Sequence, residues 1–186
     1  MIELHRVWKV FAVGPVKVPA LSDVSFRVAK GEFVTLHGSE VAALRRAIGV
    51  VFQDAKLLPG RTVYENVAFV LRVLGTPRRE ITARVFDALR SVGLSARAQA
   101  FPAQLSQGEA QRAALARAIA RKPLLLLADE PTGSLDETMA AEVIDIVKDI
   151  WAGGTTVLFA THQAGLAASL RQRRLTLVGG RLVKDG

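Results

Sequence analysis

The sequence contains no cysteine. This excludes disulfides, thiolate zinc sites and cysteine nucleophiles. Long hydrophobic runs are missing too, because the longest apolar stretches, such as 67–71 and 123–128, fall far short of the ~20 residues that span a bilayer. Charges at Glu3, Arg6 and Lys9 interrupt the N-terminus, so no signal peptide is visible. We therefore expect a protein of the cytosol.

The sequence also lacks any Gly-Lys pair, and with it the phosphate-binding loop G-x-x-x-x-G-K-[ST]. That loop supplies a backbone cradle for phosphates, a lysine for their β and γ oxygens, and a hydroxyl for magnesium. We therefore expect the chain as it stands not to hydrolyse a nucleoside triphosphate.

The charge balance favours an anionic partner. There are 25 Lys and Arg against 17 Asp and Glu in 186 residues, a formal net charge of +8. Such a partner could be a nucleotide, an acidic membrane face or nucleic acid. The arginines are spread from Arg6 to Arg181, with short clusters only, as at 78–79 and 171–174. This spread favours a solvated surface near a membrane, and we expect no specific nucleic-acid binding.

The hydrophobic pattern predicts an α/β fold, a single domain over 1–186. Segments 2–7 and 24–28 alternate in polarity and predict an antiparallel β layer. Short apolar strands alternating with helical patterns imply a mainly parallel sheet. The predicted core strands are 33–36, 48–52, 124–128 and 156–160; the predicted helices are 63–74, 80–92, 110–120 and 137–151. The first three helices form an inserted helical subdomain at about 62–118, and 174–185 predicts a hairpin turning at 179–180.

The most informative segment is residues 124–136, LLLLADEPTGSLD. An apolar run that ends in Asp129 and Glu130 predicts a buried strand whose carboxylates lie at the edge of a parallel sheet, where α/β folds place their chemistry. Two acids alone would suit a core strand followed by an acidic helix start. The complete string favours an ATP site.

A second segment, residues 105–112 (LSQGEAQR), begins a helix. Ser106 and Glu109 match a capping box, which could be their whole role. Gly108, however, costs a helix about 1 kcal/mol relative to alanine. It would let a ligand approach the free N–H groups at a positive helix end, which suits a phosphate.

Together these segments resemble ATPases of the ABC type. LSQGEAQR resembles the family's signature, and LLLLADEPTGSLD follows it as the Walker B segment. Gln53 in VFQD matches the Q-loop, Asp136 in SLD the D-loop and His162 in ATHQ the switch histidine, all in the family's order. Phe11 matches the aromatic residue that stacks on adenine, although it suits a β-layer core equally well.

The resemblance implies ATP and Mg²⁺ as cofactors and a role for each matched residue. Asp129 would coordinate magnesium, Glu130 would act as general base on the attacking water, and His162 would contact the γ-phosphate. Gln53 would complete the shell of magnesium and water. A lone histidine is often just a packed polar residue, but His162 follows an apolar strand predicted to lie beside the Walker B strand.

The signature would serve a second copy of the chain. The resemblance implies that Ser106 and Gly108, with Gln107 and Glu109 between and beside them, bind the γ-phosphate of the opposite protomer. Each active site then needs two chains in a head-to-tail, ATP-dependent homodimer. Gln107 stands where the family has glycine, and Ala110 where it has glutamine; both departures affect the affinity of the signature.

Within the family, the segment from Val51 to Gly75 and the ending GGRLVKDG are most similar to cell-division ATPases. Those act with an integral membrane protein of the FtsX type, on the inner face of the bacterial membrane. Near relatives serve lipoprotein release and macrolide export. The resemblance implies that residues 53–70 receive the membrane partner.

The family's phosphate loop should follow Gly38, its first glycine, but the sequence passes through Ser39 and Glu40 into the Q-loop strand. Ten residues, 38–47, are fewer than a parallel crossover needs, which is about a dozen or more. We therefore infer that about 20 residues or more, a loop and its helix, are missing between about 38 and 41, and that one face of the sheet is uncovered. The alternatives are a non-hydrolysing binding module that has lost the loop, and the ATPase subunit of a lipoprotein-release or macrolide-type exporter. A DNA-maintenance ATPase would need coiled-coil arms that the sequence lacks.

Overall fold

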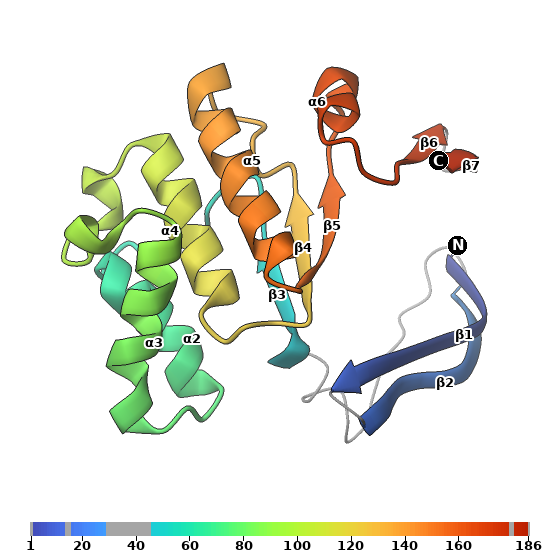
Figure 1. The fold of residues 1–186 in the computed structure, drawn as a ribbon, viewed down its shortest axis with the longest axis horizontal. Helices are drawn as coiled ribbons and strands as arrows, with labels where there is room; N and C mark the ends of the chain where they lie inside the picture. Colours follow the sequence, from blue (N-terminus) through green and yellow to red (C-terminus); the bar gives the residue numbers. More distant parts are fainter. Residues whose placement is uncertain (1, 14–15, 29–45, 179–180, 186) are drawn as a thin grey trace. The chain divides into compact units, whose positions relative to one another are not determined.

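A computed structural model describes residues 2–13, 16–28, 46–178 and 181–185 (Figure 1). The chain divides into two compact units, 1–47 and 48–186, and each is described by itself. The predicted strand 33–36 and Gly38 lie outside the described residues. So does the junction at 38–41.

The first unit contains a β-hairpin, with β1 (Ile2–Val13) antiparallel to β2 (Val16–Val28). Ile2 pairs with Val28 and Leu4 with Phe26, and the register shifts three times along the ladder. The predicted antiparallel β layer is therefore confirmed, and both strands are longer than their alternating segments indicated. Phe11 lies in β1 opposite Val18.

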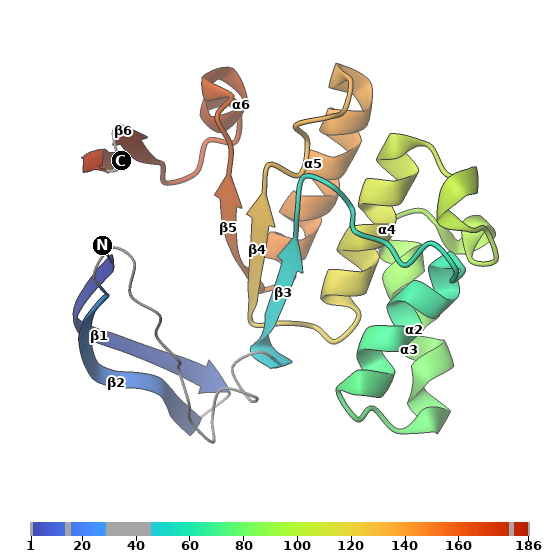
Figure 2. The same ribbon diagram turned by 180° about the vertical axis from the view of Figure 1, so that it is seen from behind.

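The second unit has a three-stranded parallel sheet in the order β3-β4-β5 (Figure 2). The strands are β3 (Ile48–Val51), β4 (Leu125–Asp129) and β5 (Thr156–Ala160). The central strand β4 is the apolar run that ends in acids, as predicted. Residues 125–128 are aliphatic because the central strand of a parallel sheet has a neighbouring strand on each side and at least one covered face.

Helices connect these strands. After β3 come α2 (Val63–Val73), α3 (Arg78–Ser91), η1 (Ser95–Arg97), η2 (Pro102–Gln104) and α4 (Gln107–Ile119). Between β4 and β5 lies α5 (Glu137–Ala152), and α6 (Ala164–Ser169) follows β5. At the end of the chain, β6 (Leu175–Val178) pairs antiparallel with β7 (Arg181–Asp185), which confirms the predicted pairing of the tail.

Local chemistry fixes several helix ends. Thr62 with Glu65 and Ser106 with Glu109 each form a complete capping box, so α4 begins three residues before the predicted helix 110–120. Asp136 caps α5 through its side chain. These caps satisfy N–H groups that have no partner within the helix.

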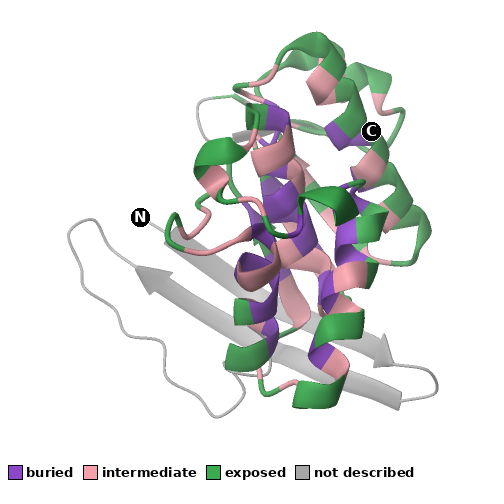
Figure 3. Ribbon diagram, turned by 90° about the vertical axis from the view of Figure 1, so that its left-hand side faces the viewer, coloured by how far each residue is buried: buried purple, intermediate pink, exposed green. Residues whose placement is uncertain are grey.

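One face of the sheet packs on α4 and α5 and forms the core together with α2 and α3. Figure 3 shows the buried residues along the inner sides of these helices. Val51, Leu126 and Ala128 are at most 2% exposed. Gly49 allows the closest approach, because a Cβ there would lie 2.7 Å from the carbonyl oxygen of Ala118 at the end of α4.

The other face of the sheet is partly exposed. Val50, Leu127 and Leu158 are register partners on adjacent strands. Val50 is 38% exposed and Leu158 56% exposed. Parallel sheets are normally covered on both faces, so this row is a place where a covering element is expected. We call it the open face.

No helix in the described part of the chain is long and apolar enough to cross a membrane.

Candidate functional site

The three strands of the sheet end at one edge, and each is followed by residues predicted to be functional. Val51 pairs with Ala128, and Asp129 pairs with Ala160. Gln53 therefore follows β3, Glu130 follows β4 and His162 follows β5 at the same edge (Figure 1). Residues separated by more than 100 positions in the sequence form one polar group here.

Glu130 is the centre of this group. Its backbone is left-handed, with φ 46°, and its N–H donates to the Ala160 carbonyl at 3.0 Å. Its carboxylate Oε1 accepts from the His162 N–H at 2.6 Å and lies 2.7 Å from His162 Nδ1. Its Oε2 accepts from the Thr161 hydroxyl at 3.2 Å. The turn after β4 thus aims Glu130 at the end of β5.

These contacts set the protonation of Glu130. Desolvation, the largest single effect, raises the pKa of Glu130, but the hydrogen bonds and charge of His162 and the Thr161 hydroxyl together hold that pKa below its ordinary value. Glu130 is therefore ionised at neutral pH. The side chain of His162 is 74% exposed and that of Glu130 19%, so an ionised acceptor lies beneath an accessible imidazole.

Gln53 lies against the turn that follows Glu130. A Cβ added to Gly133 would be 3.0 Å from Gln53 Nε2, so the absence of a side chain at Gly133 makes room for the amide. Asp129, the last residue of β4, is exposed at the same edge. The structure brings together all four residues predicted for catalysis and metal binding: Gln53, Asp129, Glu130 and His162.

A magnesium ion fits these residues only as part of a larger shell. Within the described ranges, no three His, Asp or Glu residues cluster closely enough to hold a metal by themselves. Mg²⁺ in phosphate sites takes one or two carboxylates and completes its shell with phosphate and water oxygens. The Asp129 carboxylate and the Gln53 amide oxygen are donors of that kind.

The predicted signature forms a second group at the start of α4. The Ser106 hydroxyl accepts from the Glu109 N–H at 3.1 Å, and Glu109 accepts from the Ser106 N–H at 2.9 Å. The bond from Ser106, with a smaller contribution from the Arg97 guanidinium at 2.9 Å, holds the pKa of Glu109 below its ordinary value against desolvation. Gln107 is exposed and Gly108 is buried.

Gly108 connects the signature to the helix that Asp136 caps. A Cβ on Gly108 would lie 2.8 Å from Met139 Sδ, and Asp136 accepts from the Met139 N–H at 2.8 Å. Arg112 of α4 pairs with Glu142 of α5. Among the described residues, no hydrogen bond joins Ser106 or Glu109 to Glu130 or His162. The two groups are therefore separate within one chain.

Sequence reasoning missed several residues that support these groups. Thr161 holds Glu130, and Gln111 and Arg117 of α4 bind the backbone after β3. Gln111 stands within the signature segment, where a buried glutamine in a helix could have drawn attention. Arg117 gave no signal, because nothing in a single sequence distinguishes an arginine bonded to backbone carbonyls from a solvated one.

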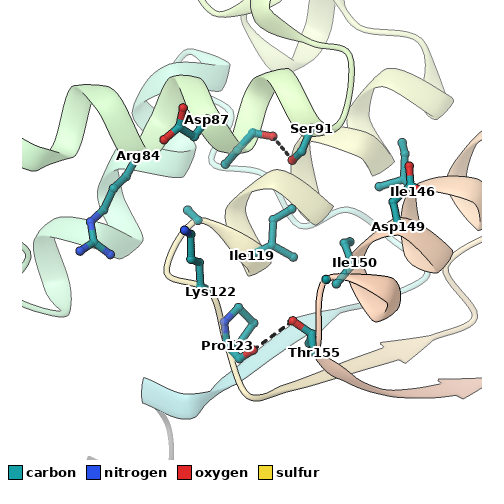
Figure 4. A pocket seen from close by; sticks show the side chains of 13 residues that line it. Arg84, Asp87, Ser91, Ile119, Lys122, Pro123, Ile146, Asp149, Ile150 and Thr155 are labelled. Atoms are coloured by element: carbon teal, nitrogen blue, oxygen red, sulfur yellow. Dashed lines mark hydrogen bonds between the residues drawn. The ribbon is translucent and has the colours of Figure 1, made fainter. Parts of the chain in front are cut away.

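A cavity of about 600 Å³ lies elsewhere, between α3 and the ends of α4 and α5 (Figure 4). Its lining is mixed, with Ile119, Pro123 and Ile150 beside Lys122 and Asp149. None of the predicted site residues lines it. The chemistry therefore belongs to the sheet edge and not to this cavity.

Comparison with known proteins relates these features to a family. Residues 39–133 match the profile described as ABC transporter. The cell division ATP-binding protein FtsE of Streptococcus pneumoniae is 46% identical over 161 residues, covering 87% of this chain and 70% of that protein. FtsE of Mycobacterium tuberculosis is 47% identical over 169 residues, covering 91% and 73%.

FtsE of Bacillus subtilis is 37% identical over 221 residues, covering 100% of this chain and 96% of that protein. Among solved structures, the ATP-binding cassette MJ0796, a dimer in a post-hydrolysis state bound to ADP and Pi, aligns with a TM-score of 0.71 and 28% identity, covering 100% of this chain and 98% of that one.

Proposed function

Since this chain belongs to the ABC transporter family, we propose that it is the ATP-binding and hydrolysing subunit of a cell-division complex. Two copies close on ATP and drive an integral membrane partner of the FtsX type, on the inner face of the bacterial membrane. The FtsE names of its relatives support the cell-division role.

The observation that carries this proposal is the contact between Glu130 and His162 at the common end of the strands. Glu130 is an ionised acceptor that can orient a water and take its proton. The exposed imidazole, 2.7 Å from that carboxylate, is placed to donate to a phosphate oxygen. Asp129 and Gln53 would hold the magnesium ion, which supplies charge stabilisation to the triphosphate when bound.

The second copy would complete the site. In one chain the Ser106 helix tip has no bond to Glu130 in the part that the structure describes, and its first-turn N–H groups suit a phosphate. We infer that Ser106, Gln107, Gly108 and Glu109 contact the nucleotide of the other protomer. Asp136 caps the Met139 N–H, and Met139 packs against Gly108. Asp136 would therefore lie at the same interface. The related cassette MJ0796 is a dimer in its solved structure, which supports this arrangement.

We further infer that the chain lacks its phosphate loop and the helix after it, and that it is inactive without them. The alignment with the Bacillus subtilis protein spans 221 positions, whereas this chain has 186 residues. At least 35 positions (221 minus 186) thus have no counterpart here. The open face of the sheet supports the loss of a covering helix. A non-hydrolysing module is the second candidate, favoured by the same missing segment.

The test restores the segment of a close relative between residues 38 and 41. The restored chain should hydrolyse ATP, and Glu130→Gln should abolish turnover while an ATP-bound dimer accumulates on size exclusion. Asp129→Ala should instead weaken binding of magnesium nucleotide in calorimetry. A restored chain that binds nucleotide yet never hydrolyses it would favour the non-hydrolysing module, and unchanged turnover in Glu130→Gln would remove the assigned base.

A further inference from the structure

Side chains of α4 hold the backbone between β3 and α2. Gln111 Nε2 donates to the Phe52 carbonyl at 2.8 Å. The Arg117 guanidinium donates to the Lys56 carbonyl at 2.6 Å and to the Ala55 carbonyl at 2.8 Å. We call these two side chains the α4 clamp. It binds the chain on both sides of Gln53.

In the clamp, Gln111 is buried and Arg117 is half-buried. Gln111 is 3% exposed, and burial lowers the pKa of Arg117. Arg117 forms no salt bridge with a described carboxylate, so the carbonyls of Ala55 and Lys56 serve as partners of a half-buried cation. If the Gln111 bond broke, its buried amide would lose that partner, and a buried donor costs more to leave unpaired than its bond contributes when made.

The clamp restricts the position of Gln53, because it holds the backbone before and after that residue. Gln53 lies between Phe52, which Gln111 holds, and Ala55, which Arg117 holds. With the backbone fixed at both sides, the Gln53 amide reaches Gly133, next to the Glu130 turn. Residues 52–56 follow β3 and pair with no described strand, so without the clamp the position of the Gln53 amide would vary more.

We propose that Gln111 and Arg117 are positioning residues that keep the Gln53 amide at the catalytic edge. The proposal rests on the proposed function, because it assigns the clamp to the hydrolytic step. A misplacement of about 1 Å at a reacting centre can reduce a rate by a factor of about 100. Loosening one side of the clamp should therefore reduce turnover by about tenfold while nucleotide still binds.

The experiment uses the chain with its phosphate segment restored and compares Arg117→Lys with Arg121→Lys. Lysine keeps the charge but cannot bridge two carbonyls in the planar fork of arginine. Arg121, also near the end of α4, donates to the Leu74 carbonyl at 3.2 Å, away from the loop, and is the matched control. We measure kcat and the Kd for Mg-ATP, with the Tm as a check of folding.

Arg117→Lys should lower kcat about tenfold, leave Kd within about twofold and increase amide exchange at residues 53–58; Arg121→Lys should change none of these. Gln111→Met, of similar volume without the donor, should give the same split if Arg117→Lys does not fold. Unchanged kcat in both clamp variants, or an equal loss in Arg121→Lys, would overturn the positioning role alone. A restored wild type without hydrolysis would overturn both this role and the proposed function.

Discussion

The open face of the sheet gives the sharpest prediction. If the restored segment covers this face, one substitution there should lower the free energy of unfolding more than it does in the present chain. Leu158 is 56% exposed, so Leu158→Ala removes a side chain that is already half in water. Burying a leucine completely contributes about 1.5 to 3 kcal/mol. If the restored segment covers this row, the same substitution should cost about 1 to 1.5 kcal/mol more in the restored chain than in the present one.

The assay is equilibrium unfolding in urea of four proteins, the present and the restored chain, each with and without Leu158→Ala. Linear extrapolation gives each free energy of unfolding. Val73→Ala in both chains is the matched control, since Val73 is 66% exposed at the end of α2 and has no part in the open face. Its cost should be the same in the two chains.

An equal cost of Leu158→Ala in both chains would show that the segment does not cover this face. The inference of a missing helix over the sheet would then be wrong. Binding of an apolar dye gives an independent reading, because it should fall when the segment is restored.

Three further predictions concern single residues. Gly49→Ala should destabilise the chain by about 1 to 3 kcal/mol in urea unfolding, because its Cβ would meet the Ala118 carbonyl at 2.7 Å; an unchanged midpoint would contradict that contact. Asn66→Ala should cost about 2 to 4 kcal/mol in the same assay, since the buried amide accepts from the Leu58 N–H and shares its two N–H donors among the carbonyls of Leu58, Arg61 and Thr62, bonds worth about 1 kcal/mol each; a cost below about 1 kcal/mol would contradict it. In the restored chain, Asp54→Lys should impair stimulation of the ATPase by the membrane partner more than it impairs basal turnover. Asp87→Lys, also exposed and paired with a neighbouring cation, is the control, and equal effects of the two substitutions would remove residues 53–70 as the partner surface.

Much of the fold follows from local pattern. β5 was predicted at its observed bounds, and α5 within one residue, because the spacing of apolar residues along the sequence distinguishes a short apolar strand from an amphipathic helix. The edge that unites Gln53, Glu130 and His162 also followed, since parallel strands share a carboxyl end. The lengths of β1 and β2 did not, because their irregular register hides the alternation.

Other features depend on tertiary contacts that a pattern does not encode. The bonds of Arg117 to carbonyls 61 and 62 positions away follow from how α4 packs beside β3. Thr161 acquires a role only because β5 ends next to Glu130. The roles of Phe11, Gly38 and the signature residues toward ATP stay predictions, as does the single domain over 1–186.

The left-handed backbone at Glu130 determines what a substitution there would change. A side chain at φ 46° is held at a penalty of about 1 to 3 kcal/mol, which glycine would escape. Mutation to glycine would relieve the backbone and in the same step remove the carboxylate with its bonds to Thr161 and His162. The bonds from Thr161 and His162 to the Glu130 carboxylate therefore offset a backbone conformation that a side chain disfavours.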